Sequence, residues 1–346
     1  MTSPEKFLGC LLGLAIGDAL GMPYAGQSQE ERSSVTDYRE FVASERVVAL
    51  QIPLGELGEP EEEEEPLGAG QWTDDTQLAL ALAECLLEER GQFVPEAWAH
   101  YLVRWLNNLP RVPGLSTLQA AFQLRAGGYG EPEEASDPEG AGCSPASRVA
   151  PVALLYSGNP AQCHDLARQQ AQITHGHPDA QAAALAVAEA ISLVLPVSAQ
   201  ERSALNGAQL LLSLKDTVYA ASPAFSDFAR CLELAHSLLE DDVETATAIR
   251  VLGSSAWSRE AVPCALYCVA RTPSDFETTL LNAVRFTTDA SESIAAIAGA
   301  ISGALNGVEA IPQRWREGVE NTEDIQALAL ALHSLRLLKV NGNFRE

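Results

Sequence analysis

Positive charge is scarce in this chain of 346 residues. It carries 22 Lys and Arg against 47 Asp and Glu, which gives a formal net charge of −25 at pH 7. Binding to DNA or RNA rests on clustered Lys and Arg, so we expect no nucleic-acid partner. An anionic membrane surface is disfavoured for the same reason. A phosphate-bearing small ligand stays open, provided that metal ions or helix N-termini offset the negative field of the protein.

Signals for secretion and for disulfide or zinc chemistry are also missing. The seven cysteines are an odd number, and no two of them have CxxC spacing. The apolar residues 7–16 have only Lys6 before them and Asp18 soon after, which is a poor secretion signal and too short to span a bilayer. We therefore expect reduced, buried thiols in a cytoplasmic monomer that contacts no membrane.

Strand-like alternation is scarce, and residues 46–52 are its best example. Helical patterns dominate, and the 47% hydrophobic content is enough for a large core. The sequence therefore predicts an all-α fold in which helices are joined by loops. The predicted helices cover residues 3–20, 76–90, 95–108, 115–125, 148–157, 160–173, 178–194, 200–213, 224–239, 243–250, 257–270, 274–284, 292–306 and 323–339.

Two acidic loops interrupt the helical pattern. Residues 54–70 contain an unbroken run of glutamates at 61–65, and residues 126–146 are rich in Gly, Pro, Asp and Glu. We interpret their acidic centres as solvated surface loops. The first loop leads into Thr73 and the second into Arg148, and loops that enter rigid helices often frame a site.

Small residues recur every four positions in two of the predicted helices. A spacing of four keeps them on one face, where helix backbones can approach closely. Glycine inside a helix costs about 0.5–1 kcal/mol relative to alanine, so its repeated use indicates a packing need. We expect the two helices to pack near each other and to join the ends of the chain. The positions are Gly9, Gly13, Gly17 and Gly21 in one helix and Ala295, Gly299, Gly303 and Gly307 in the other.

Residues 71–76 (QWTDDT) place two adjacent carboxylates and two hydroxyls at the start of a helix. Asp74 and Asp75 therefore lie on a stiff element, with their oxygens in its first turn. Hard cations such as Mg²⁺ bind this kind of oxygen ligand. Thr and Asp are also preferred at helix N-termini, where acids complement the helix dipole. The pattern alone favours capping over metal binding by roughly ten to one.

Several short motifs follow one another over nearly the whole chain. They are GCLLGLAIGDALG (9–21), QWTDDT (71–76), RVAP (148–151), THGHP (174–178) and IAAIAGAISGA (294–304), closed by Ile311-Pro312 and Trp315. Together and in this order they resemble the ADP-ribosylglycohydrolase family, of the dinitrogenase-reductase-activating glycohydrolase type. The resemblance implies one domain over residues 1–346, folded as a compact orthogonal multi-helix bundle.

The resemblance also implies a function. Members are hydrolases that remove ADP-ribose from a modified protein side chain or a related ADP-ribosyl compound, commonly with two Mg²⁺ ions; Mn²⁺ is the alternative ion. Such a metal pair can orient ribose hydroxyls and activate a water molecule, and an acidic side chain can direct that water or protonate the leaving group. Carried onto this chain, Asp74 and Asp75 are catalytic and Arg148, His175 and Gly176 bind the ligand. The implied metal ligands are Thr73, Asp74, Asp75, Asp289, Glu292 and Ser293.

Two segments depart from the family pattern. The family's second metal motif reads Gly-Gly-Asp-Thr-Asp-Thr, whereas residues 288–293 here read TDASES, so that Ala290 and Glu292 replace its two aspartates. Ala25 stands where active relatives often have a Glu. An alternative hypothesis is therefore an inactive relative that binds ADP-ribose or only a protein partner. A third is a plain helical interaction domain, whose thermal stability a cation would not change.

Three polar residues near these motifs also have structural interpretations. For Asp18 we favour a hydrogen bond to a neighbouring loop over direct catalysis. Arg148 suits a phosphate ligand, but an Arg that opens an apolar helix is more often a structural partner, by about two to one. We interpret His175 as a hydrogen-bonding loop residue and not as a zinc ligand. No serine has the sequence context of a nucleophile elbow.

Overall fold

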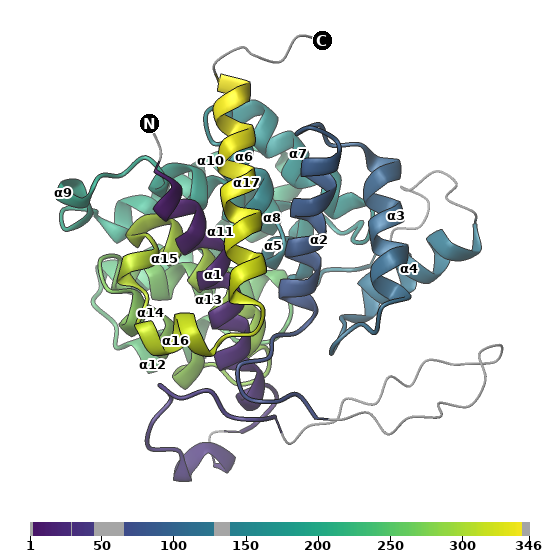
Figure 1. Ribbon diagram of the computed structural model, residues 1–346. Helices are drawn as coiled ribbons and strands as arrows, with labels where there is room; N and C mark the ends of the chain where they lie inside the picture. The colour runs from purple at the N-terminus through teal and green to yellow at the C-terminus, as the bar shows by residue number, and fades with distance from the viewer. Residues whose placement is uncertain (1–2, 29, 45–65, 128–138, 341–346) are drawn as a thin grey trace.

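The computed structural model describes residues 3–28, 30–44, 66–127 and 139–340 (Figure 1). Within these ranges the chain forms seventeen α-helices and four short 3₁₀ helices, and its β pairing is limited to one isolated bridge between Gly142 and Trp257. The predicted all-α class is confirmed. The α-helices are α1 Pro4–Gly21, α2 Asp74–Glu88, α3 Pro95–Leu106, α4 Leu115–Ala126, α5 Ser144–Ser147, α6 Ala150–Tyr156, α7 Pro160–Gln172, α8 Pro178–Val194, α9 Ala199–Arg202, α10 Gly207–Ala221, α11 Ser226–Glu240, α12 Thr245–Leu252, α13 Ser258–Arg271, α14 Phe276–Phe286, α15 Ser291–Asn306, α16 Gln313–Gly318 and α17 Thr322–Val340.

The predicted helix over residues 200–213 is wrong, because the structure divides it in two. Ser198 opens the short α9 with a capping box, in which its hydroxyl and the Glu201 side chain bond each other's backbone N–H groups. Asn206 then starts α10, where its side chain accepts a hydrogen bond from the Gln209 N–H at 3.1 Å. Two caps eight residues apart leave no room for one continuous helix.

Short helices were also missing from the prediction. The four-residue helix α5 lies in the loop expected over residues 126–146, and α16 follows α15 without a predicted counterpart. Neither is long enough to show a helical period in its sequence. The strand candidate at residues 46–52 and the acidic run at residues 61–65 lie outside the described residues.

Helices α1 and α15 pack against each other along their faces of small residues, as the sequence predicts. A Cβ atom added to Gly9 would lie 2.4 Å from the carbonyl oxygen of Gly303, and one added to Gly17 would lie 2.0 Å from that of Ala295. Low residue numbers in α1 therefore pair with high numbers in α15, so the helices are antiparallel. Such distances leave room for hydrogen but not for a side chain at these contacts.

The packing of α1 joins the two ends of the described chain. Besides α15, α1 contacts the C-terminal α17, which lies over the core with one face buried (Figure 1). Judged by length and composition alone, the helical segment 4–24 is long and apolar enough to cross a membrane. This corrects the expectation, drawn from residues 7–16, that the apolar segment is too short to do so. The most apolar window of residues 4–24 is 94% buried inside the protein, as is typical of a core helix.

The cysteines are free, as predicted. All seven lack a disulfide partner, and six of them are buried while Cys231 is partly exposed. Burial in an apolar environment raises the pKa of the Cys10 thiol, because the charged thiolate loses its hydration. These side chains therefore pack as small hydrophobic groups.

We expect Gly13→Ala to lower the free energy of unfolding by about 2 kcal/mol or more, because overpacking a tight contact forces backbone shifts. Its Cβ would lie 2.3 Å from the carbonyl oxygen of Gly299. Urea unfolding followed by circular dichroism measures the change. Gly158→Ala is the matched control, since its Cβ would meet nothing closer than 3.9 Å. Equal stability of the two variants would show that α1 and α15 tolerate a wider spacing.

Candidate active site

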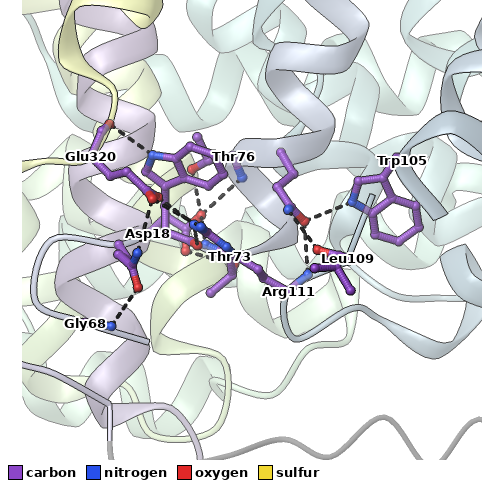
Figure 2. A network of polar contacts seen from close by, with 11 residues as sticks. Asp18, Gly68, Thr73, Thr76, Trp105, Leu109, Arg111 and Glu320 are labelled. Atoms are coloured by element: carbon purple, nitrogen blue, oxygen red, sulfur yellow. Dashed lines mark hydrogen bonds and ion pairs between the residues drawn. The ribbon is translucent and has the colours of Figure 1, made fainter. Parts of the chain in front are cut away.

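The N-terminus of α2 is capped by residues other than its two aspartates. Thr73 is the N-cap residue, and its hydroxyl accepts a hydrogen bond from the Asp75 N–H at 3.4 Å. Asp18, from α1, accepts hydrogen bonds from the N–H groups of Thr73 at 3.0 Å and Thr76 at 3.1 Å. It also accepts from both threonine hydroxyls, as Figure 2 shows. The predicted hydrogen-bonding role of Asp18 is confirmed.

Because Asp18 and Thr73 supply the cap, capping does not account for Asp74 and Asp75. Both aspartates are buried, with 6% and 2% of their surface exposed. The Asp74 carboxylate accepts a long hydrogen bond from the Gly114 N–H at 3.4 Å. Burial of two adjacent carboxylates is costly unless another group compensates their charge.

Asp75 connects the two segments in which the resemblance places metal ligands. Its Oδ2 accepts a hydrogen bond at 2.6 Å from the hydroxyl of Ser293, which is 218 residues away in the first turn of α15. Its Oδ1 accepts another from Ser147, in α5. The structure therefore brings the first turns of α2 and α15 together at α5.

Glu292 belongs to the same site, whereas Asp289 does not. Burial and the charge of Asp75 raise the pKa of Glu292 to about 8, which places the two carboxylates near each other. Its Oε2 is buried and has no hydrogen-bond partner among the described residues. Asp289 is exposed and lines a separate cavity beside Arg32 and Arg285. The side chain available from this turn is thus Glu292 and not Asp289.

Three buried acids, Asp18, Asp74 and Asp75, and the half-buried Glu292 form what we call the carboxylate cluster. Burial is the largest cause of the raised pKa of each, and it raises the pKa of Asp18 to about 7. The charges of neighbouring acids raise the pKa values of Asp18, Asp74 and Glu292 further. Raised values of this kind mean that the cluster lacks positive charge.

Arg148 is the buried cation beside the cluster. Its Nε and Nη2 donate to Gln170 at 2.8 and 3.0 Å, and Nη2 also donates to the hydroxyl of Thr174 at 2.7 Å. Burial lowers the pKa of Arg148 to about 9, while the charges of Asp74 and Asp75 act in the opposite direction. Its Nη1 has no partner among the described residues. These contacts agree with a structural role and leave the two N–H bonds of Nη1 without an acceptor among the described residues.

His175 and Gly176 follow Thr174, whose hydroxyl accepts a hydrogen bond from Arg148. The Nδ1 of His175 is 2.8 Å from the hydroxyl of Thr174, and burial lowers the pKa of the imidazole to about 3. His175 is therefore neutral at physiological pH. The carbonyl of Gly176 accepts a hydrogen bond from Gln181 at 3.0 Å, which holds the turn before α8.

Sequence reasoning did not identify all the residues that surround the cluster. Ser147 was missed, although it directly precedes the Arg148 motif. Gly114 and Arg111 were missed as well, and their only signal is a loop with two prolines between α3 and α4. Hydrogen bonds across the fold, and not a local motif, place these residues at the site.

The donor set fits a hard divalent cation. The side chains of Asp74, Asp75, Glu292 and Ser293 all offer oxygen atoms, which Mg²⁺ prefers. The unpartnered Oε2 of Glu292 and the raised pKa values are what a site for positive charge would show. In the described part of the chain, no three His, Cys, Asp or Glu side chains already stand in metal-binding geometry.

Comparisons with known proteins cover almost the whole chain. The family model described as ADP-ribosylglycohydrolase matches residues 1–341. An uncharacterised protein of Archaeoglobus fulgidus is 35% identical over 96% of this chain and 97% of its own length. ADP-ribosylhydrolase ARH3 of Bos taurus is 28% identical over 96% of this chain and 93% of its own.

A solved structure gives the same result for the fold. The structure called ADP-ribosylglycohydrolase-related protein complex aligns with a TM-score of 0.71 and 30% identity, over 96% of this chain and 98% of that one. The architecture anticipated from the resemblance is thereby confirmed. By sequence, by fold and by the meeting of its two acidic motifs, this chain belongs to the ADP-ribosylglycohydrolase family.

Proposed function

We propose that this protein uses a divalent cation, Mg²⁺ or Mn²⁺, to remove ADP-ribose from a modified protein side chain or a related ADP-ribosyl compound. Membership of the family supports hydrolysis of ADP-ribosyl bonds. The observation that carries the proposal is the hydrogen bond from Ser293 to Asp75, which unites two acidic motifs that are 218 residues apart in the chain.

Residues of both motifs would hold the cation. Asp74 and Asp75 contribute carboxylates from α2, and Glu292 and Ser293 contribute a carboxylate and a hydroxyl from α15. Thr73 is less available, because its hydroxyl already donates to Asp18 at 2.8 Å. A bound cation would orient ribose hydroxyls and lower the pKa of a bound water molecule.

The protein's own side chains orient the reacting groups. Two hydroxyls fix Asp75, so its carboxylate oxygens have defined directions. Asp74 and Asp75 face the substrate as acids that direct a water molecule or hold a proton for the leaving group. The free Nη1 of Arg148 offers a donor to a phosphate oxygen of the substrate.

A specific observation favours an inactive ADP-ribose-binding relative as the second candidate. Ala290 is the N-cap residue of α15 and offers no side-chain oxygen, and Asp289 points into another cavity. One cation position therefore has fewer ligands than the family motif provides. Calorimetry with ADP-ribose separates the two functions, since binding without turnover supports the inactive relative.

We expect Asp75→Asn to lower kcat/KM by at least about 100-fold. Losing a charged ligand costs more than the roughly 10–100-fold typical of groups that only orient ligands. The measurement is release of ADP-ribose from arginine-, serine- and nucleotide-linked substrates with Mg²⁺ or Mn²⁺. Asp216→Asn, at an exposed ion pair on α10, is the control. Turnover by Asp75→Asn equal to that of the control would contradict a catalytic cluster, and no turnover by the unmodified protein would refute the proposed activity.

In the presence of a chelator, we expect the free energy of unfolding to fall by about 2 kcal/mol as the pH rises from about 6.5 to 8.5. Folding raises the pKa of Asp18 to about 7 and that of Glu292 to about 8, whereas both pKa values are near 4 in the unfolded chain. The folded state therefore binds more protons than the unfolded state in this window, and it loses stability as those protons dissociate. Folding keeps His175 neutral, whereas the unfolded imidazole, with its ordinary pKa of about 6.5, is half protonated at the start of this window and offsets a few tenths of a kcal/mol of the fall. Chemical unfolding at several pH values measures the slope.

Mg²⁺ should flatten this slope, because a cation replaces the lost protons as the compensating charge. Glu292→Gln should also reduce it, since one titrating group is removed. A free energy of unfolding that is level or rises with pH in the chelator would contradict the electrostatics of the cluster.

A further inference from the structure

We propose that Arg111 and Glu320 are positioning residues for the catalytic aspartates, an inference that rests on the proposed function. They form an ion pair in which Arg111 Nη1 and Nη2 donate to the Glu320 carboxylate at 2.5 and 3.1 Å. Both side chains are half-buried. We call this pair the clamp. It lies beside the segment that leads from Gly68 into α2 (Figure 2).

Glu320 holds the segment that leads into the aspartates. Its backbone N–H donates to the Gly70 carbonyl at 3.0 Å, and its own carbonyl accepts from the Trp72 indole at 3.1 Å. Its carboxylate also accepts from the Gln71 side chain at 3.2 Å. Three consecutive residues just ahead of Thr73 are thus attached to one residue near the C-terminal end of the chain.

Gly70 shows how close this attachment is. Its φ of +81° is a left-handed conformation that favours glycine, and an added Cβ would lie 2.1 Å from the Gly318 carbonyl oxygen. The turn before α2 and the end of α16 therefore touch through their backbones. A change at Glu320 acts directly on the position of this turn.

Arg111 contacts the same segment, the residues that lead into α2, from the loop between α3 and α4. Its Nη1 donates to the Trp72 carbonyl at 3.2 Å, and its guanidinium lies 4.8 Å from the centre of the Trp72 ring. Its backbone carbonyl accepts a hydrogen bond from the Asp74 N–H at 2.8 Å. Arg111 therefore connects Glu320 to the main chain of Asp74.

The loop that carries Arg111 depends on such contacts. Val112 has a φ of 51°, which is an unfavourable conformation for a β-branched residue. Gly114, two residues later, donates to the Asp74 carboxylate. Strained backbone of this kind persists only where its surroundings hold it. The Arg111 N–H also donates to the Gln77 side chain at 3.0 Å, which ties the loop to α2 from a second direction.

Restraining the segment that leads into α2 matters because the acids that follow it repel one another. Asp74 and Asp75 are adjacent and buried at the start of α2, and Asp75 meets the first turn of α15, which carries Glu292. Repulsion between these like charges acts to separate the two turns. The clamp opposes that displacement without contacting the cluster through its side chains. Its effect is on where the ligands lie and not on their chemistry.

The test compares Arg111→Ala, Glu320→Ala and the double variant in the full-length protein. Amide hydrogen exchange over residues 73–77, measured with a chelator present, should accelerate at least tenfold in all three. The Mg²⁺ concentration for half-maximal thermal shift should rise at least tenfold, and kcat should fall more than KM changes. The changes in exchange, Mg²⁺ dependence and kcat should be no larger in the double variant than in either single variant, because each single substitution already breaks the clamp.

Arg271→Ala is the matched control. Arg271 has a similarly exposed side chain and pairs with Asp242, away from the cluster. We expect it to lower stability to a similar extent and to leave exchange, Mg²⁺ dependence and kcat unchanged. Glu320→Gln, which keeps an acceptor for Gln71 or Arg111, should recover part of the lost function.

The outcomes separate the clamp from the proposed activity. Unchanged exchange in the Arg111 and Glu320 variants would overturn the inference, and so would faster exchange with unaltered Mg²⁺ dependence and kcat. If the unmodified protein releases no ADP-ribose, the proposed activity fails, while exchange and the Mg²⁺ thermal shift still decide whether the clamp positions the acids.

Discussion

The direct backbone contact between α1 and α15 sets the geometry on which the site depends. Glycine and alanine place main chain against main chain, so the helices have one depth of approach and one register. In that register Gly21 lies against Ser291, at the start of α15. Asp18, less than one turn earlier in α1, therefore reaches the same end of the molecule as Glu292.

Asp18 transfers this geometry to a third helix. By accepting four hydrogen bonds from Thr73 and Thr76 it completes, with the Thr73 hydroxyl, the cap that α2 needs. The aspartates of the first turn are then free to face α15 and α5. Three helices, far apart in sequence, converge on one buried acidic volume because a single carboxylate joins two of them and the glycine contact joins the third.

Electrostatics gives this convergence its functional meaning. Burying several carboxylates together in a chain that already carries a charge of −25 opposes folding, and Arg148 supplies only part of the compensation. Protons can supply the rest, as the raised pKa values indicate, and a divalent cation can do so at neutral pH. On our proposal, the excess negative charge that lowers the stability of the fold is also what binds the cation. The contacts of Glu320 and Arg111 show that the fold also restrains the backbone segment that carries the acids.

The local sequence pattern was sufficient to predict most of the helices and the place of the two aspartates at the start of α2. Helical periodicity and end signals depend on neighbouring residues, so they placed α1, α8 and α15 near their observed bounds. They failed where an internal cap divides α9 from α10, and where α5 and α16 are too short to show a period. The glycine spacing correctly predicted which two helices meet, because a face without side chains has few other uses.

Tertiary structure alone decided which acids share the site. Asp289 and Glu292 stand three residues apart in one turn, and the sequence supports either as a ligand. The direction of α15 exposes the first, and it buries the Oε2 atom of the second at the site that contains Asp75. Ser147, Arg111 and Glu320 likewise reach α2 through contacts between distant segments. Sequence by itself determined the helices and the chemical character of their ends; only packing determined which ends meet, because that depends on how closely backbones approach across the core.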